Sequence, residues 1–150
     1  MLREGDAAPA FSLRGDDGLV HKLSDFGGKK VVVYFYPKDD TPGCTVEACS
    51  FRDSMSGLLS RGAAVVGISR DSQDSHRKFK SKYKLNFLLL SDEDGSVCKN
   101  YGVLVEKNMY GRKSLGIQRS TFVIDEKGII KKIFPRVNPE GHSEEVARYL

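Results

Sequence analysis

The chain has 150 residues, a length typical of one domain with a sizeable hydrophobic core. Hydrophobic residues make up 39% and charged residues 29%, the ordinary balance of a globular protein. The 24 basic and 20 acidic residues give a net charge of +4 and are interleaved, which does not indicate a nucleic-acid-binding surface. No apolar run approaches the ~18 residues of a membrane span, and the first residues lack the apolar stretch of a signal peptide. The composition therefore predicts a cytoplasmic protein without membrane or nucleic-acid partners.

Seven segments rich in β-branched and aromatic residues are predicted to form strands. In chain order they are residues 10–13, 19–23, 31–36, 63–69, 87–91, 121–125 and 129–134. The first two pair as a hairpin around the turn at 15–18, and the last two pair as an antiparallel hairpin around 126–128. The stretch 104–117 has no regular pattern and contains two glycines, so we expect a long loop near the functional site.

Four helices are predicted. One begins at Pro42 and continues past Met55, and the others cover residues 72–84, 96–101 and 143–150. The second is amphipathic, because His76, Phe79 and Tyr83 share one face and most basic residues lie on the other. That basic face is interpreted as a solvated surface rather than a binding patch. Ser143 is the expected N-cap of the last helix.

The order of these elements predicts a single α/β domain over residues 1–150. A β-hairpin is followed by a β-α-β-α-β unit, a short helix, a second hairpin and a final helix. Because β-α-β crossovers are right-handed, the middle strands should be parallel, and the last hairpin adds antiparallel strands. This order fits a thioredoxin-like fold with an N-terminal β-hairpin addition.

The third predicted strand is followed directly by a helix start that contains a cysteine. Pro37 ends the strand, Thr41 or Asp40 is the expected N-cap, and Pro42 takes the first helical position. Cys44 therefore lies in the first turn of a helix, just beyond the C-terminal end of a buried strand. Open α/β sheets place their chemistry at that edge.

The position of Cys44 favours a reactive thiolate. A free cysteine with a pKa of about 8.5 is only about 3% thiolate at pH 7. Free backbone N–H groups and the helix dipole favour the anion, but full ionisation would raise the reactive fraction by only about 30-fold. A catalytic Cys44 therefore needs hydrogen-bond donors and a cation as partners. Thr41 and the main-chain N–H groups of Gly43 and Cys44 are the local candidates.

A second cysteine, Cys49, follows five residues later. On an ideal helix this spacing corresponds to about 7.5 Å of rise and about 500° of rotation. A disulfide requires Cα atoms closer than about 7 Å with facing Cβ atoms. Cys44 and Cys49 therefore cannot bond while the helix is intact, and any redox cycle between them would be a conformational cycle. The alternative is that both are small buried apolar residues, a reading that suits Cys49 better than Cys44.

Several charged residues have both a functional and a structural interpretation. By its position alone, Arg119 is a surface arginine at the start of a strand. Glu47, one turn after Cys44, could pair with a basic side chain and orient it, or it could be a favourable helix-start charge. The second interpretation, with some structural pairing, is preferred. Asp40 and Asp53 are interpreted as a cap and a surface charge.

The remaining cysteine and the histidines do not predict a metal site. Cys98 has no cysteine or histidine at metal-binding spacing, and it is expected to be a small buried residue. His21, His76 and His142 are far apart in the sequence, and no HxxxH or CxxC motif occurs. His142 is expected to be part of a helix start rather than a catalytic residue.

The pattern Pro37-x-x-x-Thr41-x-x-Cys44 resembles the peroxidatic-cysteine signature of the peroxiredoxins. The longer run 36–53 resembles the peroxiredoxin Q group, also called bacterioferritin comigratory proteins. In that group a resolving cysteine lies five residues after the peroxidatic one, as Cys49 does here. The resemblance covers nearly the whole chain, including the Ala-Pro-x-Phe segment at 8–11, and it implies the same thioredoxin-like fold.

The resemblance also implies a reaction and a set of roles. Cys44 would attack a peroxide and become a sulfenic acid, and Cys49 would then form an intramolecular disulfide that a thioredoxin-like dithiol reductant reduces. Arg119 and Thr41 would stabilise the reacting oxygens, and Pro37 and Gly43 would border the peroxide. No cofactor or metal is required. Intramolecular resolution needs no second chain, so a monomer is expected.

The main alternative is a thiol–disulfide oxidoreductase of the same fold. Such proteins usually carry C-x-x-C at this helix start and a cis-proline before the opposing strand. Here the spacing is C-x4-C, and Ser120-Thr121 stands where thioredoxins have Pro-Thr. Both features favour the peroxidase.

Overall fold

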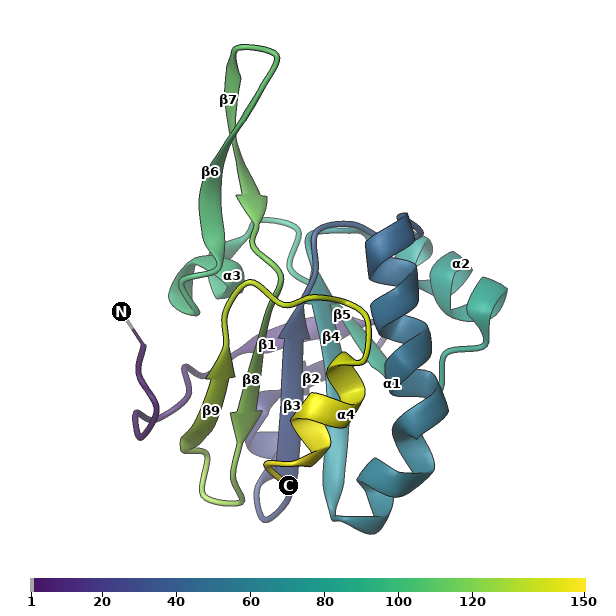
Figure 1. Ribbon diagram of the computed structural model, residues 1–150, viewed down its shortest axis with the longest axis vertical. Helices are drawn as coiled ribbons and strands as arrows, with labels where there is room; N and C mark the ends of the chain where they lie inside the picture. Colours follow the sequence, from purple (N-terminus) through teal and green to yellow (C-terminus); the bar gives the residue numbers. More distant parts are fainter. Residues whose placement is uncertain (1) are drawn as a thin grey trace.

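The computed structural model describes residues 2–150, with residue 109 described by its backbone alone. Seven strands form a mixed central sheet in the order β2-β1-β5-β4-β3-β8-β9 (Figure 1). Their bounds are β1 Ser12–Gly15, β2 Val20–Lys22, β3 Lys30–Phe35, β4 Ala63–Ser69, β5 Leu88–Ser91, β8 Ser120–Ile124 and β9 Ile130–Phe134. The strands β3, β4 and β5 are parallel, whereas β8, β9, β1 and β2 are added antiparallel. The predicted fold class and strand directions are therefore confirmed.

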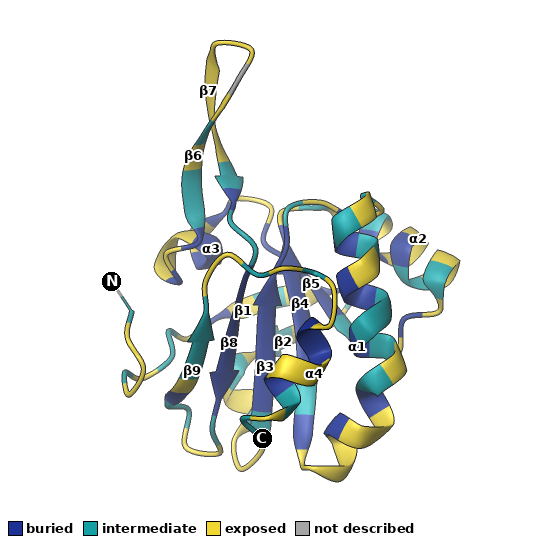
Figure 2. Cartoon of the chain, viewed as in Figure 1, coloured by how far each residue is buried: buried dark blue, intermediate teal, exposed yellow. Residues whose placement is uncertain are grey.

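Helices cover both faces of this sheet. The elements are α1 Pro42–Ser60, α2 Gln73–Tyr83, α3 Ser96–Asn100, α4 His142–Ala147 and a short 3-10 helix, η1, at Leu23–Phe26. Alternate residues of β3 point to opposite faces, so Val32 and Tyr34 pack with α1, α2 and α4, while Val31 and Val33 pack with α3. The central strands are accordingly buried along almost their whole length (Figure 2).

The long helix α1 begins at Pro42, where the sequence predicts it, with Thr41 as the N-cap residue. Its buried residues recur every three or four positions, which aligns them on the side that faces the sheet: Cys44, Glu47, Ala48, Phe51, Met55 and Leu58. The first buried position of this stripe is Cys44, so the helix packing itself points the thiol toward the sheet.

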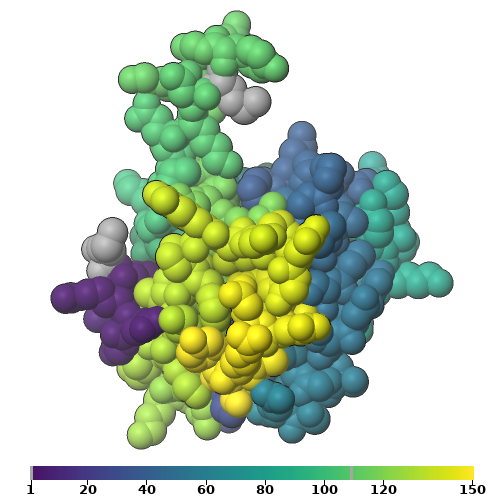
Figure 3. Space-filling view, viewed as in Figure 1, coloured from purple at the N-terminus to yellow at the C-terminus, as the bar shows by residue number. Residues whose placement is uncertain are grey.

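The stretch 104–117 is a β-hairpin, and the predicted long loop was wrong. The strands β6 (Leu104–Met109) and β7 (Arg112–Ile117) pair antiparallel around Tyr110 and Gly111, whose φ values of 54° and 77° suit a two-residue hairpin turn. The hairpin extends away from the body of the molecule (Figures 1 and 3). Most of β7 is exposed, so no buried face imposes the apolar–polar alternation by which strands are recognised.

The last helix also differs from the prediction. It covers His142–Ala147, and its N-cap is Gly141 rather than Ser143. Ser143 is buried, and its hydroxyl contacts the hydroxyls of Ser50 and Ser54 on α1 at 2.7 and 2.8 Å. The serine therefore joins two helices, a long-range contact that a local capping pattern cannot indicate.

Across residues 2–150, no helix is long and apolar enough to cross a membrane.

Candidate active site

Cys44 lies where β3 ends and α1 begins, at the C-terminal edge of the parallel strands. Thr41 has extended φ and ψ angles of −100° and 156°, so the chain turns from the loop directly into the helix. Only 1% of Cys44 is exposed. The predicted placement of this thiol in the first helical turn is confirmed.

Arg119 reaches the thiol from the neighbouring strand. It precedes β8, which pairs antiparallel with β3 so that Ser120 lies opposite Phe35 at the end of that strand. This pairing brings the guanidinium across to the helix, where Nη2 donates to the Cys44 Sγ at 3.3 Å and Nη1 donates to Glu47 Oε1 at 2.7 Å. Burial by itself lowers the pKa of Arg119, but the anionic groups of Glu47 and Cys44 outweigh it and raise that pKa. A permanent cation is thus held against the sulfur.

Glu47 pairs with this arginine, so the preferred interpretation as a helix-start charge was wrong and the alternative, pairing with a basic side chain, is confirmed. Its side chain is fully buried, and among the described residues its Oε2 atom has no hydrogen-bond partner. Burial raises the pKa of Glu47 to about 7, although the charge and hydrogen bond of Arg119 act in the opposite direction. A carboxylate in this position fixes one side of the guanidinium and leaves the other side for Cys44. Helical spacing places Glu47 on the same side of α1 as Cys44, and this spacing is the feature of the sequence that indicates its burial.

Glu47→Gln should change how the stability depends on pH. The folded pKa of about 7 lies above the ordinary value of 4.5, so between these values the folded chain holds a proton that the unfolded chain releases. The wild-type free energy of unfolding should therefore fall as the pH rises through this window. Glutamine does not titrate, so the free energy of unfolding of the variant lacks this pH dependence. The difference between the variant and wild type should therefore shift in favour of the variant by up to about 3 kcal/mol as the pH rises from 4.5 to about 7. Urea unfolding at several pH values measures this, and parallel profiles would contradict it.

The two neighbours of the thiol named from the sequence lie in the same turn. The Thr41 hydroxyl donates to the carbonyl oxygen of Lys38 at 2.8 Å, so its lone pairs remain available as acceptors. A Cβ atom on Gly43 would lie 3.1 Å from Arg119 Nη2, so a larger residue here would push the guanidinium back by a few tenths of an ångström. Pro37 lies half-buried between β3 and α1.

Asp40 does not cap α1, contrary to the prediction. Its φ is 56°, and its carboxylate accepts hydrogen bonds from Lys82 Nζ at 2.8 Å and from the Tyr83 hydroxyl at 2.6 Å. These contacts tie the loop before α1 to the end of α2. Asp53 is confirmed as a largely exposed charge, paired with Arg52.

The other two cysteines lie in very different places. Cys49 is half-buried in the same helix as Cys44, and both are free thiols. Cys98 is buried in α3, in the cluster on the opposite face of the sheet from Cys44. Burial raises the pKa of Cys98 strongly, and the nearby Asp92 raises it further. Cys98 is thus the small buried residue that the sequence predicts, and the sheet separates it from Cys44.

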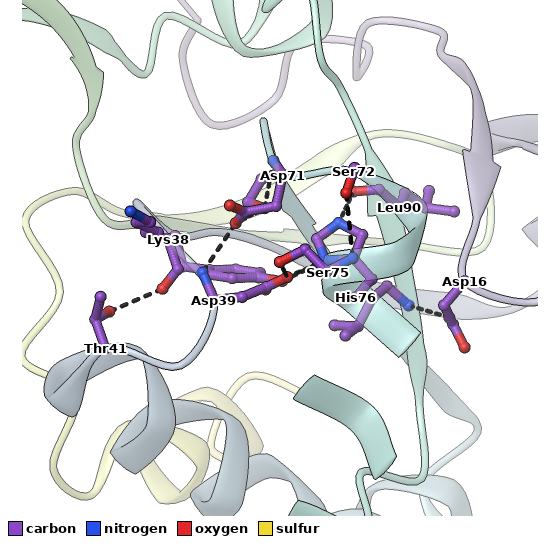
Figure 4. A network of polar contacts seen from close by, with 12 residues as sticks. Asp16, Lys38, Asp39, Thr41, Asp71, Ser72, Ser75, His76 and Leu90 are labelled. Carbon is purple, nitrogen blue, oxygen red and sulfur yellow. Dashed lines mark hydrogen bonds and ion pairs between the residues drawn. The ribbon is translucent and has the colours of Figure 1, made fainter. Parts of the chain in front are cut away.

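One cluster of possible metal ligands occurs within the described part of the chain. Oxygen and nitrogen atoms of Asp39, Asp71 and His76 lie within 4.8 Å of one another. The His76 nitrogens already contact Asp39 and the carbonyl oxygen of Leu90, so the cluster is joined by hydrogen bonds (Figure 4). No pattern in the sequence indicates this cluster, because Asp39 lies far from Asp71 and His76 along the chain. His142 begins α4, as expected, and contacts Thr121 Oγ1 at 2.7 Å.

Comparisons with known proteins agree with this geometry. Residues 4–133 match the model of the AhpC/TSA family. A Coxiella burnetii protein named as a peroxiredoxin bcp is 55% identical over 149 residues, covering 99% of both chains. Peroxiredoxin Bcp of Escherichia coli is 46% identical, covering 99% of this chain and 96% of that one.

Two solved structures have the same fold. A cysteine-to-serine mutant of PrxQ from Xylella fastidiosa superposes with a TM-score of 0.93 at 36% identity, covering 99% of this chain and 94% of that one. A Xanthomonas campestris bacterioferritin comigratory protein, described for its alkyl peroxide reduction activity, superposes at 0.88 with 38% identity, covering 92% and 88%. The resemblance stated from the cysteine motif is therefore confirmed: this chain belongs to the AhpC/TSA family, in its peroxiredoxin Bcp group of thiol-dependent peroxidases.

Proposed function

We propose that Cys44 is the peroxidatic cysteine of an enzyme that reduces hydrogen peroxide and organic hydroperoxides. The observation that supports this most directly is the 3.3 Å contact from the Arg119 guanidinium to the buried Cys44 sulfur. The thiolate attacks one peroxide oxygen, the S–O bond forms as the O–O bond breaks, and the leaving oxygen departs as water or an alcohol after taking a proton. The alkyl peroxide reduction attributed to the X. campestris relative supports the inclusion of organic hydroperoxides.

The proposed roles of the surrounding groups follow the charge in this step. Negative charge moves from the sulfur to the leaving oxygen, so a fixed cation and main-chain N–H donors act on both. Arg119 supplies the cation, and the N–H groups of Gly43 and Cys44 supply donors at the helix start. Thr41 offers its lone pairs to the peroxide O–H. Pro37 and Gly43 border the space that the peroxide enters.

Cys49 is the proposed resolving cysteine. The Cys49 sulfur attacks the Cys44 sulfenic acid, so the S–S bond forms as the S–O bond breaks, and the leaving hydroxide departs as water with the proton that the Cys49 thiol gives up. A thioredoxin-like dithiol then restores both thiols by exchange. Because both cysteines belong to α1, the first turns of the helix must unwind before the sulfurs meet. The reducing environment that such a cycle needs supports a cytoplasmic location, and intramolecular resolution supports a monomer.

Cys49→Ser should react with one equivalent of peroxide, stall as the sulfenic acid and over-oxidise more readily than wild type. Cys98→Ser is the matched control and should cycle nearly normally with thioredoxin, because its thiol lies on the other face of the sheet. Thiol loss followed by stopped flow, with mass spectrometry of the products, measures both. A Cys44–Cys98 linkage in oxidised wild-type protein would show that Cys49 is not the resolving cysteine.

The unwinding step is tested separately by hydrogen exchange. Amides 43–50 should exchange faster in the disulfide form than in the reduced form, because the bond is incompatible with the first turns of α1. Equal protection in both forms would exclude the unwinding.

The thiol–disulfide oxidoreductase remains the weaker candidate. Within residues 2–150 there is no cis peptide bond, whereas that class is expected to carry a cis-proline before the opposing strand.

A further inference from the structure

A single peptide group lies between Thr41 and a polar network behind the active site. The carbonyl oxygen of Lys38 accepts the Thr41 hydroxyl at 2.8 Å. The N–H of the same peptide group, which belongs to Asp39, donates to Asp71 Oδ2 at 2.8 Å (Figure 4). The carboxylate of Asp71 is thereby connected to the Thr41 hydroxyl through one peptide plane.

Asp71 is itself held in place at the end of β4. The Ser69 hydroxyl donates to the same Oδ2 atom at 2.7 Å, and the Asp71 N–H donates back to that hydroxyl at 3.1 Å. Asp71 is only half-buried, so its side chain can be changed without opening the core. Its orientation is therefore set by two short contacts with Ser69, the last residue of β4.

The side chain of Asp39 anchors the other end of the peptide group. Its carboxylate accepts hydrogen bonds from the Tyr36 hydroxyl at 2.6 Å, from the Ser75 hydroxyl at 2.8 Å and from His76 Nδ1 at 2.7 Å. The other ring nitrogen of His76 donates to the carbonyl oxygen of Leu90 at 3.0 Å. These contacts fix the loop against α2 and β5.

This arrangement decides whether the Thr41 hydroxyl acts as a hydrogen-bond donor or as an acceptor toward the peroxide. A hydroxyl has one proton, and Thr41 gives it to the Lys38 carbonyl oxygen, so toward any further partner this hydroxyl can act only as an acceptor. Hydrogen bonds in a chain polarise one another, so an acceptor oxygen on the N–H side of the peptide makes its carbonyl oxygen a better acceptor. Asp71 therefore strengthens the bond that keeps the Thr41 proton turned away from the peroxide.

We propose that Asp71 is a positioning residue, which acts through the Lys38–Asp39 peptide group to hold Thr41 as a hydrogen-bond acceptor for the peroxide. The proposal rests on the role given to Thr41 in the proposed function. It assigns Asp71 no contact with the substrate.

The test compares Asp71→Ala with Asp71→Asn, each in a Cys49→Ser background so that only one reaction of Cys44 is read. Alanine removes the acceptor, whereas asparagine keeps an acceptor oxygen and makes the same change in charge. The rate constant of Cys44 with hydrogen peroxide should fall in Asp71→Ala by up to about tenfold, the limit set by complete loss of the Thr41–Lys38 hydrogen bond, and stay near wild type in Asp71→Asn. Asp74→Ala, an exposed acid on α2, is the charge control and should change nothing.

A second readout separates positioning from a general loosening of the loop. Alkylation of Cys44 by iodoacetamide depends on exposure and ionisation of the thiol but not on an acceptor at Thr41. It should therefore proceed at the wild-type rate in Asp71→Ala. A parallel loss in both reactions, or an unchanged peroxide rate, would overturn the proposal.

A double-mutant cycle completes the test. Thr41→Val removes the hydroxyl, so Asp71→Ala should slow the peroxide reaction no further in that background. Additive losses would mean that Asp71 acts elsewhere and would overturn the proposal. If Thr41→Val alone kept the wild-type rate, the role of Thr41 in the proposed function would fail as well, and that result is read directly from the single variant.

Discussion

Cys44→Ser protein is expected to reduce no peroxide above the uncatalysed rate. The reaction requires a nucleophile that is anionic near neutral pH and whose atom can accept the peroxide oxygen. A serine hydroxyl at the same position keeps its proton, and the contact from Arg119 then has no anion to stabilise. Peroxide consumption with thioredoxin as the reductant measures the loss.

The fold of this variant should be unaffected, because serine is close to cysteine in size and the remaining residues of the α1 stripe are unchanged. Thermal unfolding near the wild-type midpoint would establish that the loss is chemical. The Cys98→Ser control should retain most of its activity. Appreciable turnover by folded Cys44→Ser protein would remove the basis for the proposed function.

Arg119→Met should lower the rate constant with peroxide by about 10² to 10³, the typical cost of losing one positioned donor that acts on charge in the transition state. Methionine fills part of the same space but offers neither charge nor N–H groups. Arg119→Lys keeps the charge but lacks the planar guanidinium that contacts both Cys44 and Glu47. Its rate constant should therefore lie between those of wild type and Arg119→Met. Stopped-flow measurements at a single pH compare all three.

The methionine variant leaves Glu47 buried without its partner, which can destabilise the protein by itself. Arg119→Met combined with Glu47→Gln removes both charges and serves as the matched control. It should recover stability while remaining slow with peroxide. Recovery of the reaction rate in this double variant would mean that Arg119 acts only by balancing Glu47, and near wild-type rates in Arg119→Met would place the arginine outside the reaction.

Local sequence patterns determined most of the architecture. The bounds of β4 agree with the predicted segment 63–69, because a buried strand flanked by charged residues and glycine is recognisable within a short window. The start of α1 follows from Thr41 and Pro42, whose backbone preferences act over one turn. The same local signals place Cys44 at the helix start, where backbone N–H groups favour its thiolate.

The hairpin at 104–117 and the start of α4 could not be predicted in this way. Strand β7 is largely exposed, so burial imposes no alternation on its residues, and its pairing depends on the turn at Tyr110 and Gly111. Ser143 looks like a helix cap, but its hydroxyl is taken by serines of α1 that lie 89 and 93 residues earlier. At the ends of helices and strands, such tertiary contacts outweigh the local capping and turn preferences of single residues.

The electrostatics of the active site were decided only by the tertiary structure. Arg119 lies 72 residues from Glu47 and 75 from Cys44, and only the pairing of β8 with β3 brings the three together. By its position in the sequence Glu47 is a helix-start charge, yet packing buries it completely and makes it the partner of the arginine. The sequence by itself determined which thiol lies in the first turn of α1 and is therefore the candidate nucleophile, because that position depends on neighbouring residues. The charge that acts on that thiol depends on burial and on strand order, which exist only once the chain has folded.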